Sequence, residues 1–238
     1  MPGAPGVESR ASLSETSKKV KADSLFCLTK DSMAYQRSEK MQQRLAANRE
    51  RILGAARKLV SKGGLREARM GTVATEAGLS TGALYRYFPS KADLFVDVLN
   101  AAVDHEILIL DQIIEGPGSA RDRLRNAVAS FVRRALRGPN LAYAFIAEPT
   151  EADVDAARML CRKQFGEVFK RIIRTGIANH EFPEQDVDAS AACIVGAFTE
   201  ALVGPIAPST RGTKNQDRLI DAVSSFCVAA VVGAGTDA

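Results

Sequence analysis

The sequence predicts an all-α protein, with a small helix-turn-helix head followed by a larger helical bundle. Apolar residues recur at helical spacing over most of the 238 residues, and no segment alternates with period two for long. Glycine and proline separate the periodic segments, as at Gly116-Pro117 and Gly138-Pro139. Hydrophobic residues make up 46% of the chain, which is enough to build a buried core.

The head is predicted from two short helices and the start of a third. Met70 to Ala77 carries apolar side chains at helical spacing, and Gly78 then ends the helix, because glycine tolerates the left-handed conformation. Ser80 can cap a second helix of about seven residues, which stops before Pro89. Ser90-Lys91-Ala92-Asp93 reads as a capping box that begins a long helix.

The outer positions of the second helix indicate nucleic-acid binding. In a helix-turn-helix this element enters the DNA major groove. Small residues allow close approach to DNA, and arginine, tyrosine and hydroxyl groups reach phosphates or bases. A lysine in the first turn of the next helix, beside free backbone amides, suits a phosphate. The candidate DNA-binding residues are Arg69, Thr81, Gly82, Ala83, Tyr85, Arg86, Tyr87 and Lys91.

The run Gly-Leu-Ser-Thr-Gly-Ala-Leu-Tyr-Arg-Tyr-Phe-Pro-Ser-Lys-Ala-Asp-Leu-Phe, from Gly78 to Phe95, resembles the DNA-binding domain of the tetracycline-repressor (TetR) family of bacterial transcriptional regulators. Asn48 to Ala56 is similar to the first helix of that family, so the resemblance covers roughly residues 45–106. Family members usually open the second helix with serine or threonine, where Ala68 and Arg69 stand here. We therefore expect that helix to lack a hydroxyl cap, and Arg69 to contact phosphate instead.

The remaining elements follow from the same periodicity. We expect a mostly disordered extension over residues 1–44, a DNA-binding domain over 45–92 and an effector-binding and dimerisation domain over 93–238. The extension is either a basic arm that adds DNA contacts or an inert tail, and Met33 is an alternative start. Outside the two short helices, the expected helices span residues 46–62, 91–115, 120–137, 141–147, 152–179, 186–203 and 216–232.

Charge supports a DNA-binding head. Residues 1–95 hold 17 lysines and arginines against 9 acidic residues, a net charge of +8, whereas residues 96–238 hold 15 against 19, a net charge of −4. An enzyme is disfavoured, because the chain has no G-x-S-x-G elbow, glycine-rich phosphate loop or carboxylate and histidine cluster. We expect no cofactor, no signal peptide and no membrane span, and hence a cytoplasmic protein.

The cysteines do not form a metal site. Cys27, Cys161, Cys193 and Cys227 include no Cys-x-x-Cys pair, and the chain has two histidines. The three later cysteines lie in apolar helical patterns, so we expect buried thiols, with a redox sensor as the alternative.

Aromatic and sulfur-containing side chains in the bundle could enclose an apolar ligand. The alternative is that they only fill the core, and the TetR resemblance favours the ligand, because such regulators bind small effectors in this region. In the helix that begins at Ala152, Arg158 is expected on the outer face, and His105 is expected in the core or at its boundary. The candidate effector-pocket residues are Phe131, Tyr143, Phe145, Met159, Phe165, Phe169 and Phe198.

The last two helices carry strips of small residues that would let helices from two subunits pack closely as a four-helix bundle. Internal packing within one chain is the alternative. The candidate dimer-interface residues are Ala192, Gly196, Glu200, Phe226 and Ala229.

These features together predict a homodimeric, ligand-responsive transcriptional repressor. Two recognition helices about one DNA turn apart would read a palindromic double-stranded operator, and a small apolar or amphipathic effector would release them. A DNA-binding activator or architectural protein without an effector is the alternative.

Overall fold

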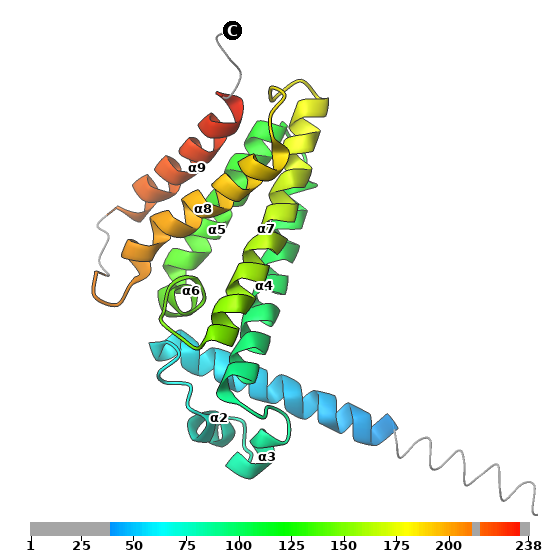
Figure 1. The fold of residues 1–238 in the computed structure, drawn as a ribbon, viewed down its shortest axis with the longest axis vertical. Coiled ribbons are helices and arrows are strands. Elements are labelled where there is room, and N and C mark those ends of the chain that lie inside the picture. Colours follow the sequence, from blue (N-terminus) through cyan, green and yellow to red (C-terminus); the bar gives the residue numbers. More distant parts are fainter. Residues whose placement is uncertain (1–38, 211–214, 234–238) are drawn as a thin grey trace, which may run out of the picture. The chain divides into compact units, whose positions relative to one another are not determined.

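The computed structural model describes residues 39–210 and 215–233, and all regular structure in these ranges is helical. The all-α prediction is confirmed. The chain divides into two units, residues 1–50 and residues 51–238. After a first helix over residues 39–63, the helices are α2 (Met70–Glu76), α3 (Thr81–Tyr85), α4 (Lys91–Ile114), α5 (Ala120–Arg137), α6 (Pro139–Ile146), α7 (Ala152–Ala178), α8 (Val187–Ile206) and α9 (Gln216–Val232) (Figure 1).

Three predicted boundaries are wrong. The first helix begins at residue 39, because residues 39–45 are mostly good helix formers although they lack an apolar stripe; residues 1–38 lie outside the described part. Pro139 opens α6 at the first helical position, where a missing N–H costs nothing. Pro205 does not end α8, which runs one residue further to Ile206, because the missing N–H removes only one hydrogen bond of the helix, to the Ala201 carbonyl.

The head has its own hydrophobic cluster, which joins the first helix from Ile52 onward to α2, α3 and the start of α4. The predicted turn between α2 and α3 is confirmed. Gly78 has φ +65°, and the Ser80 hydroxyl accepts the Ala83 N–H at 3.2 Å. Lys58 and Glu76 form an ion pair at 2.5 Å between the first helix and α2, and this hydrogen bond lowers the pKa of the Glu76 carboxyl.

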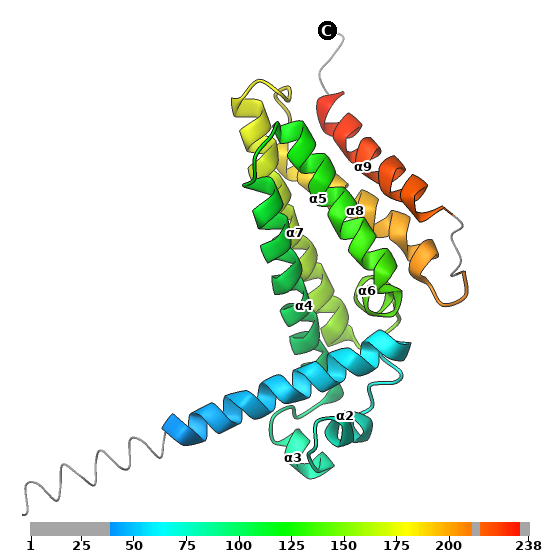
Figure 2. The same cartoon turned by 180° about the vertical axis from the view of Figure 1, so that it is seen from behind.

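The bundle behind the head forms a second hydrophobic cluster from α4 to α9. In it α4 packs against α5 and α7, α5 packs against α9, and α8 packs against α7 and α9 (Figures 1 and 2). Aromatic rings join these helices at the centre. The Phe131 ring lies 5.5 Å from Phe165 and 4.7 Å from Phe198, and Phe198 lies 5.5 Å from Phe169.

Helix α8 is unusually apolar for its position. By length and composition alone it could cross a membrane, with a mean hydropathy of 1.6, and only 39% of its most apolar window is buried inside the protein. It is not free of charge, because it carries Asp188 and Glu200. A single chain therefore leaves much of an apolar helix uncovered.

Two glycines in left-handed conformation offer a matched test of packing. Gly64 has φ +78°, and a Cβ added there would lie 2.7 Å from Oε2 of Glu148, whereas Gly78 has open space. Gly78→Ala should lower the free energy of unfolding by about 1–2 kcal/mol, because alanine is strained in the left-handed conformation. Gly64→Ala should lower the free energy of unfolding by roughly 1–3 kcal/mol more than Gly78→Ala does, because it also displaces the buried, hydrogen-bonded carboxylate of Glu148. Urea unfolding measures both, and equal losses would show that Glu148 imposes no constraint on Gly64.

Candidate functional site

Helix α3 presents a polar edge at the end of the head. Its one buried residue, Leu84, anchors it to the head cluster. Thr81, Gly82 and Arg86 are exposed, and Tyr85 is 48% exposed. Figure 1 shows α2 and α3 at the end of unit 51–238 farthest from α9. This edge is short, polar and accessible, as a major-groove reading element requires.

The recognition helix is shorter than predicted. It ends at Tyr85, and Arg86 and Tyr87 lie in the turn that follows, where the Tyr87 N–H donates to the Leu84 carbonyl at 2.9 Å. Tyr87 is half-buried and packs against the head cluster, so its predicted place on the outer edge of the helix is wrong. Burial of Phe88 draws this turn inward.

Arg69 and Lys91 flank the same end of the head. Arg69 precedes α2 and makes no side-chain cap, as predicted. Lys91 Nζ lies 5.1 Å from the centre of the Phe95 ring. The capping box of Ser90 and Asp93 is confirmed, and it occupies the Asp93 amide, so that amide is not free for a phosphate as expected. A shallow depression beside α3 is lined by Arg69, Gly71, Thr72, Thr75, Glu76 and Thr81.

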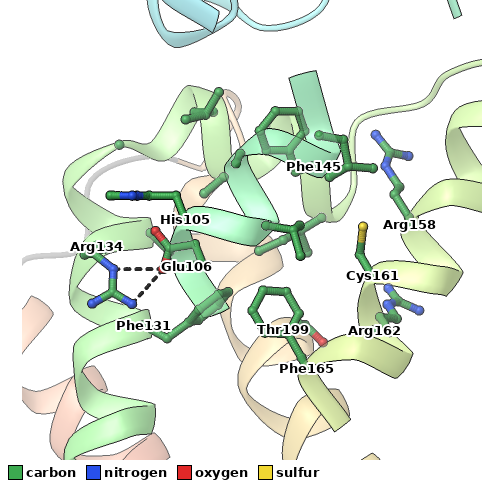
Figure 3. A pocket seen from close by; sticks show the side chains of 18 of the residues that line it. His105, Glu106, Phe131, Arg134, Phe145, Arg158, Cys161, Arg162, Phe165 and Thr199 are labelled. Carbon is green, nitrogen blue, oxygen red and sulfur yellow. Dashed lines mark hydrogen bonds and ion pairs between the residues drawn. The ribbon is translucent and has the colours of Figure 1, made fainter. Parts of the chain in front are cut away.

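A cavity of about 320 Å³ opens inside the bundle, between α4, α5, α6 and α7 (Figure 3). Its size lies at the lower end of the range for small-molecule sites. Most of its wall is apolar. The apolar lining residues are Leu99, Ala102, Val103, Phe131, Ala135, Leu141, Ala142, Phe145, Ile146 and Phe165.

The polar part of the cavity wall carries more positive than negative charge. Arg57, Arg134, Arg158 and Arg162 contribute, and Glu106 is the one acidic lining residue. Glu106 accepts two hydrogen bonds from Arg134, at 2.6 and 2.8 Å, on the opposite side of the cavity from Arg158 (Figure 3). The wall can therefore accommodate an amphipathic molecule with an anionic or oxygen-rich end.

Three of the seven predicted pocket residues line this cavity: Phe131, Phe145 and Phe165. Phe169 and Phe198 are fully buried; the Phe198 ring packs against Phe131, and the Phe169 ring packs against Phe198. The last two, Tyr143 and Met159, do not line the cavity either, and Met159 is 57% exposed. His105, predicted in the core or at its boundary, is exposed and lines the cavity.

The prediction that Arg158 lies on the outer face of α7 is wrong. The residue is 9% exposed and lines the cavity. Its Nη1 pairs with Asp155 Oδ1 at 2.6 Å. Its Nη2 donates to the carbonyl oxygens of Ala144 and of Glu148, the latter at 2.8 Å. Periodicity could not reveal this, because two of the three acceptors are carbonyls at and just beyond the end of α6 that only the fold brings to α7.

Helix α6 joins the cavity to the head. The Asn140 side chain donates to the carbonyl oxygens of Ser61 and Lys62 at 2.9 and 2.8 Å, at the end of the first helix. Just beyond α6, the buried carboxylate of Glu148 accepts the Leu65 N–H at 3.0 Å. No pattern in the sequence marks this carboxylate. The helix that lines the cavity is thus bonded to the head at both ends.

The outer face of α8 and α9 is exposed in the single chain. All five predicted dimer residues lie on it, namely Ala192, Gly196, Glu200, Phe226 and Ala229. Phe226 is 62% exposed, which is unusual for so large an apolar side chain.

The cysteines differ from the prediction in one case. Cys161 and Cys227 are buried as expected, but Cys193 is exposed; Cys27 lies outside the described part. Burial raises the pKa of both the Cys161 and Cys227 thiols to about 11, with a smaller contribution from Asp104 at Cys161. Within residues 39–210 and 215–233, no three histidine, cysteine, aspartate or glutamate side chains form a group that could hold a metal ion.

Comparison with known proteins supports this geometry. Residues 52–98 match the family described as bacterial regulatory proteins, tetR family, and residues 117–202 match the tetracyclin repressor-like C-terminal domain. The HTH-type transcriptional repressor KstR of Rhodococcus jostii is 31% identical over 173 residues, which are 72% of this chain and 78% of that protein.

Solved structures share the fold. FadR from Bacillus subtilis in complex with stearoyl-CoA has a TM-score of 0.66 and 19% identity, over 76% of this chain and 98% of that chain. RolR in complex with resorcinol has a TM-score of 0.59 and 19% identity, over 78% of this chain and 89% of that chain. At this level of identity the two structures support the fold alone.

The buried thiols should make the protein sensitive to alkali. Thiols that ionise at about pH 9 in the unfolded chain stay protonated to about pH 11 in the folded chain, so the free energy of unfolding should be unaffected below pH 9 and fall between pH 9 and 11. We expect a loss of roughly 1–2 kcal/mol per thiol. Urea unfolding across this range tests it. The double variant Cys161→Ser, Cys227→Ser should show a shallower decline, and an identical decline would contradict the assignment.

Proposed function

The chain belongs to the tetR family of bacterial regulatory proteins, and from this premise we propose which surfaces bind its operator, its effector and its second subunit. Its function is that of a ligand-responsive, DNA-binding transcriptional repressor. The domain division, the contact residues and the identity of each partner are our proposals, together with action in the cytoplasm. The observation that carries them is the polar, accessible edge of α3 on a head that is bonded to the cavity-lining helix.

The operator-binding surface is the exposed edge of α3 with its two flanks. Thr81, Gly82 and Ala83 at the front of the helix allow close approach to base edges, and Tyr85 and Arg86 reach bases or phosphates. Arg69 and Lys91 bind the DNA backbone on either side of α3. Half-buried Tyr87 acts mainly by positioning the turn that follows α3. We assign residues 45–92 to DNA binding and residues 93–238 to effector binding and dimerisation.

The effector occupies the cavity between α4 and α7. An apolar wall with a cationic edge suits an amphipathic molecule, and two structural neighbours are described with stearoyl-CoA and with resorcinol. We favour an acyl thioester of coenzyme A over a small phenol, because four arginines and one glutamate suit a ligand with an anionic end.

The second subunit covers the α8 and α9 face. Helix α8 has a mean hydropathy of 1.6, yet only 39% of its most apolar window is buried within one chain. A second copy of the same face would bury the exposed apolar surface. Small residues at Ala192 and Gly196 let the helices approach, while Phe226 gives the interface a large apolar anchor. The dimer then presents two α3 edges to the halves of a palindromic operator.

Arg86→Ala should weaken operator binding by about 1–3 kcal/mol, because the lost guanidinium contacts a base or a phosphate. Electrophoretic shift on the DNA upstream of the protein's own gene measures this, with stearoyl-CoA added to test release. Arg133→Ala is the matched control, since it removes one exposed arginine from α5. Thermal unfolding should be the same in both variants. Equal operator affinity in the two variants would refute the assignment of Arg86, and a wild type that shifts every duplex equally would refute a specific operator.

Phe226→Arg should raise the dimer dissociation constant more than tenfold, because losing an aromatic hot spot costs about 2 kcal/mol or more. Leu108→Arg is the matched control, since Leu108 is 61% exposed on α4 and Phe226 is 62% exposed on α9. Sedimentation equilibrium measures both. In a Cys27→Ser background, exposed Cys193 should react with iodoacetamide faster in the Phe226 variant than in the dimer. A Phe226 variant that stays dimeric at wild-type affinity would exclude this interface.

A further inference from the structure

The buried guanidinium of Arg158 has one donor group to spare. Its Nη1 and Nη2 are engaged by Asp155, Ala144 and Glu148, but its Nε has no hydrogen-bond partner among the described residues. A buried donor without an acceptor is unfavourable and rare in folded proteins. Arg158 lines the cavity, but its Nε is covered, so an oxygen atom of a bound molecule can satisfy this donor when the guanidinium turns toward the cavity.

The same guanidinium holds the end of α6. Its Nη2 binds the carbonyls of Ala144, in the last turn, and of Glu148, just beyond it. The Glu148 carboxylate in turn binds the Leu65 N–H in the turn that follows the first helix. Glu148 is 9% exposed and Leu65 is 4% exposed, so water does not compete freely for this bond. Two residues therefore separate the cavity from the backbone of the head.

Gly64 shows how closely the carboxylate fits. A side chain at this position would place its Cβ 2.7 Å from one carboxylate oxygen of Glu148 and 3.0 Å from the other. The Glu148 carboxylate therefore lies in the space that a side chain at position 64 would need. Movement of the α6 end must change either the Leu65 bond or the position of the turn.

We propose that Arg158 binds an oxygen acceptor of the effector through Nε, and that this bond alters the hold of Arg158 on Glu148 and so the attachment of the head. The proposal rests on the proposed function that the cavity holds the effector. The acceptor is a carbonyl or hydroxyl oxygen joined to an apolar group. Arg158 is both the ligand-binding residue and the first member of the relay, and Glu148 is a positioning residue.

Binding of matched probes tests the ligand contact. Dodecanoyl-CoA carries a carbonyl oxygen that its thioether analogue, dodecyl-CoA, lacks, and resorcinol represents a hydroxyl source. By calorimetry, wild type should bind dodecanoyl-CoA about tenfold more tightly than dodecyl-CoA, and Arg158→Lys should lose this preference. If resorcinol binds in place of the thioester, Arg158→Lys should weaken it by the same factor. A lysine variant that keeps the wild-type preference overturns the contact.

Arg123→Lys is the matched control. Arg123 also has an Nε without a partner among the described residues, and its Nη1 holds the Ile114 carbonyl at 2.7 Å, but it does not line the cavity. It should leave probe binding unchanged while removing similar hydrogen bonds. If it weakens probe binding as much as Arg158→Lys does, the effect is a general loss of packing and the proposal is wrong.

Amide hydrogen exchange at Leu65 tests the relay without any probe. Exchange should be about tenfold faster in Arg158→Lys and in Glu148→Ala, unchanged in Arg123→Lys, and partly restored in Glu148→Gln, which keeps an oxygen acceptor. Unchanged exchange in Arg158→Lys overturns the relay. If no probe binds wild type, the proposed effector class fails, and the Leu65 exchange rate still decides whether Arg158 and Glu148 act together.

Discussion

Helix α6 packs against the head and also lines the cavity, and the rest of the structure depends on this double contact. One side lines the cavity through Leu141, Ala142, Phe145 and Ile146. Phe145 also packs against the head cluster, in which Ala144 is fully buried. Because well-packed interiors transmit displacement instead of absorbing it, a molecule that enlarges the cavity presses on the element that supports the head.

The head could be predicted closely from the sequence because its signals are local. Gly78, Ser80 and the Ser90 capping box each act within a few residues, so spacing alone locates the turns and helix starts. The same holds for α5 and α9, whose predicted bounds agree with the structure. The errors in the head arose where burial, which is not local, shortened α3 and turned Tyr87 inward.

The cavity could be predicted only in part, because helical periodicity separates inside from outside but cannot distinguish a cavity wall from solid core. Phe165 and Phe169 share the inner face of α7, yet only Phe165 reaches the cavity. Arg158 was placed outside because a charged side chain is seldom buried without a partner. Two of its partners are the backbone carbonyls of Ala144 in α6 and of Glu148 just beyond it, which carry no side-chain signature in a sequence.

The free energy of the buried hydrogen bond between Glu148 and Leu65 is large enough to couple the effector to the operator. Coupling between effector and operator in allosteric proteins is typically about 1–3 kcal/mol. A hydrogen bond to a charged group contributes about 1.5–3 kcal/mol, so the Glu148 bond to Leu65 matches the coupling required. Because coupling is reciprocal, DNA that fixes the head must weaken effector binding by the same factor. In the proposed mechanism the bundle needs no large rearrangement. Arg158 only exchanges part of its bonding to the carbonyls of Ala144 and Glu148 for a bond to an oxygen atom of the effector.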